Sequence, residues 1–167
     1  MYDNLTESDI DKIKKEIEHR KLVVRPEAIK AVQEARAQGD LSENFEYYAA
    51  KREKNANESR IRYLENMLKT AQVIEHEYAG DEVGMNSEVV LFNEKTGREM
   101  TVRIVTTIRT NPLKGLISID SPIGKAVYRH KVGERLPVTL DNGDCYFVEI
   151  RSIGETVDDS NDQISQY

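Results

Sequence analysis

Apolar side chains in the first part of the chain recur every three or four positions, which is the spacing of one face of a helix. The residues that keep this spacing are Ile10, Ile13, Ile17, Ile29 and Val32. Pro26 interrupts the series, and proline fits best at the first position of a new helical segment. The pattern therefore predicts a first helical arm that is broken or kinked at Pro26.

A second series begins after Gln38–Ser42, a segment typical of a helix end followed at once by a helix start. Its seam consists of Tyr47, Ala50, Lys54, Asn57, Ile61, Leu64, Leu68 and Ala71. It predicts a helix from Glu43 to about His76, roughly 50 Å long at the usual rise per residue. Two long arms with a short connection must lie antiparallel, so residues 1–77 are predicted to form an antiparallel coiled-coil hairpin. One face of a larger helical bundle is the alternative, but no further helical segments follow to complete it.

From about Glu88 the pattern changes to that of β-strands. The predicted strands are Glu88–Phe92, Glu99–Val105, Leu116–Asp120, Leu136–Leu140 and Tyr146–Ile150. Asn142 and Gly143 form the strongest hairpin signal, and Pro122–Tyr128 fits a short helix capped by Ser121. Residues 88–154 are thus predicted to form a small, mainly antiparallel β-sheet domain with a short helix, which makes the fold class α+β.

The remaining segments are short. Residues 78–87 contain Gly80 and Gly84 and fit a linker. Residues 155–167 are polar, acidic and without periodicity, and are predicted to form a disordered tail.

Composition limits the possible classes of function. Of the 167 residues, 32% are charged, which suits an extended helical element better than one large core. The net charge of −6 gives no reason to expect binding to duplex DNA or to an anionic membrane. Cys145 is the only cysteine, so a disulfide framework and a multi-cysteine metal site are excluded. No apolar run is long enough to span a membrane, and we expect a cytoplasmic protein with no membrane partner.

Asp40 and Glu43 lie at the predicted start of the second arm. Their spacing is that of a capping box, in which each side chain bonds to the other residue's backbone N–H. Two carboxylates at the end of a long rod could also supply oxygen ligands to Mg²⁺. They are too few for a complete site, so the ion would be held mainly by another molecule. The spacing alone leaves both interpretations open.

The segment Gly39–Tyr47 with Ala49-Ala50-Lys51 closely resembles the tip of the Gre transcript-cleavage factors of bacteria, the GreA/GreB family, and most nearly its GreA members. A second matching motif runs from Leu116 to Ala126, and the resemblance covers about residues 6–153.

This resemblance implies that the coiled coil enters the secondary channel of bacterial RNA polymerase, while an FKBP-like C-terminal domain docks at the channel mouth. Asp40 and Glu43 would help to hold the second catalytic Mg²⁺ of the polymerase and orient the attacking water. The polymerase would then cleave the 3′ end of backtracked nascent RNA. The chain would not be an enzyme and would need no cofactor of its own, Asn44 would support the tip, and we expect a monomer.

The resemblance also implies two contact surfaces. Lys51 and Arg52 match a basic patch that contacts the RNA 3′ segment, although such charges are equally typical of a solvated helix face. Asp120, Ser121, Pro122 and Ile123 match a region associated with docking on the polymerase. A strand end followed by a helix cap would explain those four residues equally well.

Two other functions stay open. A regulator could occupy the same channel and inhibit or modulate polymerase without promoting cleavage. A prolyl isomerase with a coiled-coil arm would rest on fold analogy alone, and the domain has no tryptophan and few aromatics to line a proline pocket. Both tip acids are present, which favours an active cleavage factor.

Overall fold

The computed structural model describes residues 4–39, 44–74 and 80–165. It divides into a helical unit, Ile10–Ala71, and a sheet unit made of the residues up to Asp9 and from Gln72 onwards. None of the helices in the described ranges is long and apolar enough to cross a membrane.

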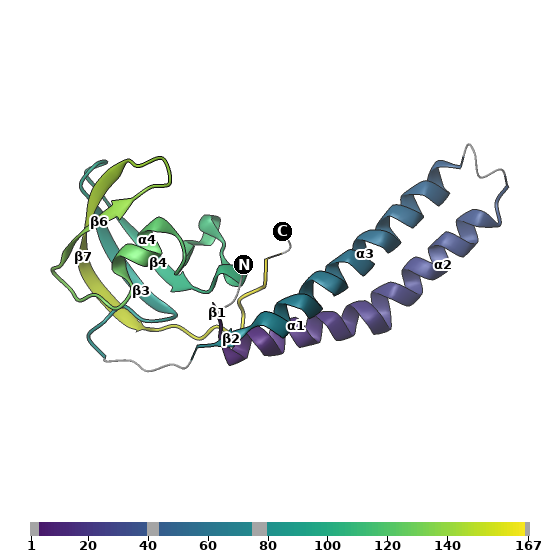
Figure 1. The fold of residues 1–167 in the computed structure, drawn as a ribbon, viewed down its shortest axis with the longest axis horizontal. Helices are drawn as coiled ribbons and strands as arrows, with labels where there is room; N and C mark the ends of the chain where they lie inside the picture. The colour runs from purple at the N-terminus through teal and green to yellow at the C-terminus, as the bar shows by residue number, and fades with distance from the viewer. Residues whose placement is uncertain (1–3, 40–43, 75–79, 166–167) are drawn as a thin grey trace. The chain divides into compact units, whose positions relative to one another are not determined.

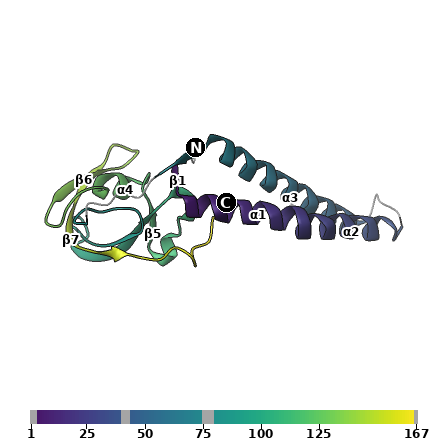
Figure 2. The ribbon, with the colours of Figure 1, turned by 90° about the horizontal axis from the view of Figure 1, so that it is seen from below.

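The helical unit is a hairpin of two arms (Figure 1). The first arm consists of α1 (Glu7–His19), a π-helical segment (Arg20–Val24) and α2 (Arg25–Arg36). The second arm is α3 (Phe45–Thr70), which packs along α2. The predicted helical hairpin is therefore confirmed, and Figure 2 shows its two arms from below.

The first arm passes Pro26 without a break. Proline has no N–H and cannot continue the ladder of i to i−4 hydrogen bonds, but it occupies the first turn of α2, where that N–H is not needed. The turn before it widens instead, and the N–H of Arg25 donates to the carbonyl of Arg20, five residues back. A local π-helix thus takes the place of the predicted break, and π-turns of this kind are among the usual sites of helix kinks.

The seam of the hairpin is apolar in one part and polar in another. Ile13, Ile17, Ile61, Leu64 and Met67 are buried. Farther along the arm, buried Asn57 donates to the carbonyl of Arg20 at 3.2 Å and accepts from Arg20 Nη1 at 3.1 Å. A buried asparagine in a coiled coil favours one register, because any slip leaves its amide without partners.

The second arm is shorter than predicted. α3 ends at Thr70, and its 26 residues span about 39 Å rather than roughly 50 Å. Ala71 has extended backbone angles, and β2 (Gln72–Val73) pairs in parallel with β1 (Asn4–Leu5). Pairing with this distant segment ends the helix, which local periodicity cannot reveal.

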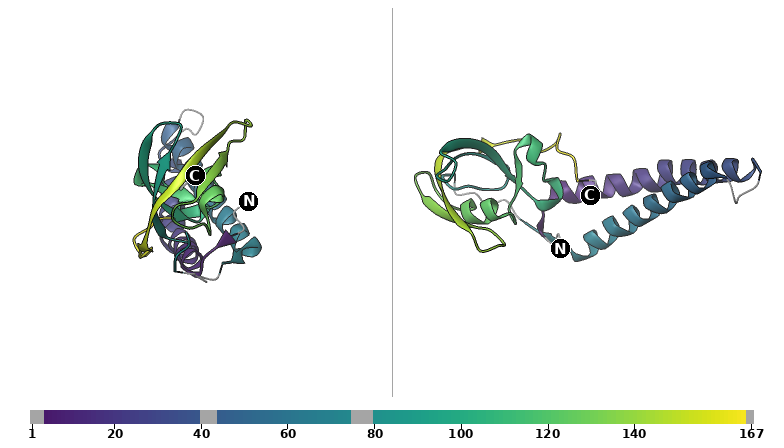
Figure 3. Two further views of the ribbon diagram at one scale, coloured as in Figure 1. Left: turned by 90° about the vertical axis from the view of Figure 1, so that its left-hand side faces the viewer. Right: turned by 90° about the horizontal axis from the view of Figure 1, so that it is seen from above.

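Besides the β1–β2 pair, the described part of the sheet unit contains a five-stranded sheet in the order β5-β4-β3-β7-β6. Its strands are β3 (Ser87–Asn93), β4 (Arg98–Val105), β5 (Leu116–Ser118), β6 (Arg135–Thr139) and β7 (Cys145–Thr156). All neighbours are antiparallel except β4 and β5, which are parallel. The mainly antiparallel sheet is confirmed, with one parallel edge that makes it mixed. It curls around α4 (Pro122–Val127), as Figure 3 shows, and its core includes Val89, Leu91, Ile104 and Ile150.

The sheet unit also includes part of the predicted linker. Val83 and Met85 are buried in the core, and β3 begins at Ser87. Gly80 and Gly84 suggested a linker, but the apolar residues beyond Gly80 pack as core.

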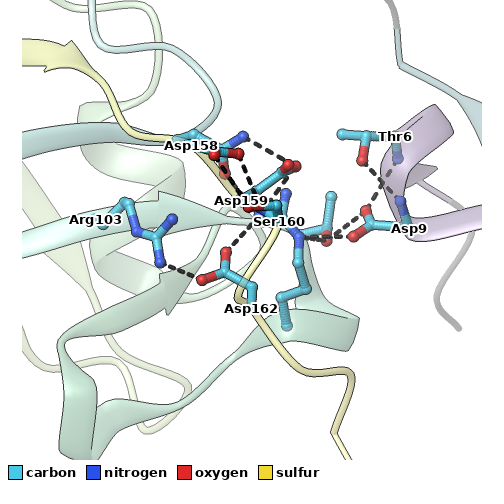
Figure 4. A network of polar contacts seen from close by, with 10 residues as sticks. Thr6, Asp9, Arg103, Asp158, Asp159, Ser160 and Asp162 are labelled. Carbon is cyan, nitrogen blue, oxygen red and sulfur yellow. Dashed lines mark hydrogen bonds and ion pairs between the residues drawn. The ribbon is translucent and has the colours of Figure 1, made fainter. Parts of the chain in front are cut away.

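The C-terminal segment lies against the sheet unit, in contrast to the predicted disordered tail. β7 continues to Thr156, and the backbone N–H of Val157 donates to the carbonyl of Asn86 at 3.0 Å. Asp162 accepts from Arg103 at 2.5 Å (Figure 4) and from Arg109 at 2.9 Å. The polar, acidic composition of this segment suggested disorder. The segment is ordered because its aspartates pair with two largely buried arginines, and composition cannot reveal such partners.

Arg109 is fully buried and joins three parts of the sheet unit. Its Nε lies 2.6 Å from Asp9 Oδ1, and its Nη1 donates to Asn86 Oδ1 at 2.7 Å as well as to Asp162. Asp9 itself accepts from the backbone N–H of Thr6 and from the hydroxyl of Thr106. Thr6 in turn accepts from the N–H of Asp9, so these two residues form the reciprocal cap at the start of α1.

The contacts of Asp162 predict a pH dependence of stability. Burial by itself raises the pKa of this carboxyl, but the hydrogen bonds and charges of Arg103 and Arg109 outweigh it and hold the pKa below its usual value. A carboxylate with a depressed folded-state pKa stabilises the fold above its unfolded-state pKa of about 4, and this contribution is lost as the pH falls through the folded-state value.

We therefore expect Asp162→Asn to lower the free energy of unfolding by roughly 1–2 kcal/mol at pH 7. The difference from the unaltered chain should begin to shrink as the pH falls below the unfolded-state pKa of about 4 and should keep shrinking as the pH passes through the lower folded-state pKa. Urea unfolding at a series of pH values measures it, with Glu155→Gln, an exposed charge in the same tail, as the control. A difference that is unchanged between pH 7 and pH 3 would contradict the assignment.

Candidate functional site

The two predicted tip acids belong to the connection between the arms of the hairpin. α2 ends at Arg36 and α3 begins at Phe45, so Asp40 and Glu43 lie between two long helices in the sequence. Both lie outside the described residues. The site is therefore defined by the residues that border it, of which Asn44 makes the most specific contacts.

Asn44 links the end of one arm to the start of the other. Its Oδ1 accepts from the backbone N–H of Tyr47 at 3.0 Å, which makes it the N-cap of α3. Its Nδ2 donates to the carbonyl of Ala35 at 2.6 Å, near the end of α2. One side chain thus satisfies an otherwise unpaired N–H of α3 and ties the two helices together.

The position of this cap bears on whether Asp40 and Glu43 form the N-cap of α3. An Asp40–Glu43 capping box would start α3 directly after Asp40, but α3 starts at Phe45 with Asn44 as its cap. α3 therefore begins with Asn44 as its cap, while the contacts of Asp40 and Glu43 themselves lie outside the described residues. Either acid would have served as a local cap by spacing alone, but neither is required to begin α3.

Replacing Asn44 with alanine should destabilise the chain by roughly 1 kcal/mol, the usual cost of losing a side-chain N-cap. It also removes the bond to Ala35, so the amides of Tyr47 and Tyr48, which donate to Asn44, should exchange faster with solvent. Asn44→Asp is the matched control, because aspartate keeps the cap acceptor and loses only the donor to Ala35. Hydrogen exchange followed by NMR measures both, and equal exchange in all three proteins would show that Asn44 does not hold the tip.

The first turns of α3 carry an exposed aromatic and basic face. Phe45, Tyr48 and Arg52 are three and four positions apart and share one side of the helix, with Lys51 beside it. The side chain of Phe45 is 86% exposed and that of Tyr48 is 47% exposed. Lys51 and Arg52 are exposed as well. The sequence motif predicted the two cations as contact residues but not Phe45, for which its position off the coiled-coil seam was the available signal.

The predicted docking residues lie in the other unit, where β5 leads into α4. Ser121 is the N-cap of α4: its hydroxyl accepts from the N–H of Gly124 at 3.0 Å and donates to the carbonyl of Ser118 at 2.6 Å. Pro122 occupies the first turn, and Ile123 packs against the core. Asp120 is exposed and accepts from the hydroxyl of Thr107 at 2.8 Å. All four therefore have structural contacts, and Asp120, which is exposed, is the most accessible to a partner.

The turn into α4 also depends on Gly124. A Cβ at this position would lie 2.0 Å from the carbonyl oxygen of Ser118 and 2.9 Å from Cα of Ile119. Only glycine allows the helix to approach the preceding strand this closely. The backbone next to Asp120 is thus held by the Ser121 cap and by the close approach of Gly124 to Ser118.

The family follows from comparison of the whole chain. A sequence model described as the N-terminal part of transcription elongation factors matches residues 4–73, and one described as the C-terminal part of GreA/GreB matches residues 78–155. The chain belongs to the GreA/GreB family of transcription elongation factors. Both matches stop before the C-terminal segment that contacts Arg103 and Arg109.

Individual GreA/GreB relatives cover most of the chain. Transcription elongation factor GreA of Mesoplasma florum is 41% identical over 152 residues, which are 89% of this chain and 96% of that protein. GreA of Caldanaerobacter subterraneus subsp. tengcongensis is 42% identical over 140 residues, 83% of this chain and 89% of that protein. Among solved structures, GreA factor homolog 1 of Thermus thermophilus is 29% identical, covers 93% of this chain and all of its own, and has a TM-score of 0.42.

Proposed function

We propose that this chain stimulates the Mg²⁺-dependent cleavage of backtracked nascent RNA by bacterial RNA polymerase, with its hairpin inserted into the secondary channel. The observation that carries the proposal is the placement of Asp40 and Glu43 between two long helices, where Asn44 rather than either acid caps α3. Membership of a family of transcription elongation factors supports it independently.

The donor set fits a shared magnesium ion. Carboxylate oxygens are the ligands that Mg²⁺ prefers, and two of them leave most of its coordination shell to other groups. Among the described residues no cluster of three potential metal-ligating side chains occurs. When bound between these acids and the polymerase, the ion would supply charge stabilisation at the scissile phosphate and lower the pKa of a bound water. Asp40 and Glu43 would orient that water, and Asn44 would hold them at the end of the arm.

The start of α3 fits the RNA itself. Lys51 and Arg52 would contact phosphates of the extruded 3′ segment, and such contacts weaken as salt rises. Phe45 and Tyr48 lie beside them, and exposed aromatic rings stack on bases of single-stranded RNA. In the sheet unit, Asp120 and the turn at Ser121–Ile123 would dock on the polymerase.

A stalled, backtracked elongation complex tests the proposal. With this protein and Mg²⁺ the complex should release short 3′ RNA fragments and resume elongation. Binding that slows or blocks the polymerase without release of RNA would instead establish the runner-up, a channel-binding inhibitor. Without the factor, the same complex gives the intrinsic cleavage rate for comparison.

A further inference from the structure

The C-terminal segment beyond the family match is bound to the sheet unit by side-chain and backbone hydrogen bonds. Its carboxylate Asp162 receives two charge-assisted hydrogen bonds, from Arg103 on β4 and from Arg109. The backbone N–H groups of Val157 and Ser165 donate to the carbonyls of Asn86 and Ile108, so the segment is fixed at both ends as well.

The site offers more hydrogen-bond donors than the tail uses. Within the described part of the chain, Arg103 Nη1 and Arg109 Nη2 are buried and have no hydrogen-bond partner. Buried donors without acceptors are costly, and a native structure contains few of them. Next to Arg103 lies a cavity of about 250 Å³, whose other lining residues include Lys114, Asn111 and the tail residues Asn161 and Gln163. The tail therefore fills only part of the space and of the donor capacity.

The charges at the site require an anion. Arg103 and Arg109 carry two positive charges, and Asp9 balances one of them from the start of α1. The tail supplies the balancing carboxylates, Asp162 and also Asp159, whose Oδ2 lies 3.7 Å from Arg109 Nη1. Without the tail one positive charge would stay in a largely buried place, where an unpaired charge is strongly destabilising. Asn86 adds neutral contacts: its amide oxygen accepts from Arg109, and its Nδ2 donates to Asp159 at 3.4 Å. Two guanidinium groups with an amide beside them match the oxygens of aspartate side chains.

We propose that Arg103, Arg109 and Asn86 form a binding site for an acidic peptide segment, which the chain's own tail occupies in cis. An aspartate-containing segment of another protein can enter only when Asp162 leaves. The tail therefore lowers the apparent affinity of the site for that partner. The tail benefits from a high effective concentration and can block the site although it satisfies the site incompletely. This inference does not depend on the tip acids or on RNA cleavage.

The test uses the full chain and a fluorescently labelled synthetic peptide with the sequence of residues 155–167. Fluorescence anisotropy should show that the peptide binds the Asp162→Asn chain at least roughly tenfold more tightly than the unaltered chain, where the tail competes in cis. Adding Arg103→Gln to Asp162→Asn should abolish binding. Glu155→Gln removes one tail charge outside the site and should behave like the unaltered chain.

A charge-conserving change keeps the test valid if Asp162→Asn folds poorly. Asp162→Glu keeps a carboxylate for Arg103 and Arg109 and should leave the Val157 and Ser165 amides slow to exchange, whereas Arg103→Gln should accelerate their exchange. The inference is overturned if these amides exchange equally in all variants, or if the peptide binds none of them. Complete displacement of the peptide by inorganic phosphate at equal concentration would also overturn it, because the site would then be a simple anion site.

Discussion

Asp40→Ala and Glu43→Ala should each reduce factor-stimulated RNA cleavage by roughly two to three orders of magnitude, the usual loss when one preorganised group of a transition-state site is removed. The reason is that each acid would supply an oxygen to a metal shell that the polymerase cannot complete with the same geometry alone. The cleavage rate of the double variant should be about equal to that of the slower single variant, because the two acids act as a unit.

The measurement is the rate of 3′ fragment release from a backtracked complex at saturating factor. Glu27→Ala, which removes an exposed acid from α2, is the matched control and should leave the rate unchanged. Competition between altered and unaltered chains for the polymerase separates catalysis from binding. Tip variants that compete normally but do not cleave support the proposed role, whereas tip variants that cleave normally exclude it.

Gly124→Ala should produce the largest loss of stability of any single methyl addition considered for the sheet unit. The new Cβ would lie 2.0 Å from the Ser118 carbonyl oxygen, and backbone atoms cannot give way as a flexible side chain can. Overpacking of this kind costs about 3 kcal/mol or more. The displaced turn should also move Asp120 and Ser121, so affinity for the polymerase should fall together with stability.

Gly80→Ala is the control for Gly124→Ala, since a Cβ at Gly80 meets no atom within 4 Å and its φ lies outside the left-handed region. Thermal unfolding measures both. A melting temperature for Gly124→Ala within a degree of the unaltered chain would mean that α4 can retreat from β5. The close approach would then have no bearing on the docking turn.

The fold was predictable where local pattern determines it. The three-to-four spacing of Ile61 and Leu64 locates the packed part of the hairpin, and Ser121-Pro122 marks the start of α4. The end of α3 was not predictable, because it depends on the pairing of Gln72–Val73 with Asn4–Leu5, which are far apart in the sequence. The same limit explains the parallel edge formed by β5.

The candidate site divides along similar lines. Motif spacing placed Asp40 and Glu43 at a helix start, but several residues there can cap a helix, and only the structure shows that Asn44 does so. The role of Arg109 had no signal in the sequence. Its partners Asp9 and Asp162 are far from it along the chain, and an arginine is buried only when such partners converge on it.

The π-helical segment Arg20–Val24 changes which side chains of the first arm face α3. One additional residue in a helical turn rotates everything beyond it by about 100°, since an α-helix turns once in 3.6 residues. Positions counted from α1 and from α2 therefore follow two different phases. This offset accounts for Leu22 and Val23, apolar residues that lie 67% and 42% exposed at the boundary between the phases. Deletion of one residue in this turn would bring the two phases together and direct a different side of α2 toward α3.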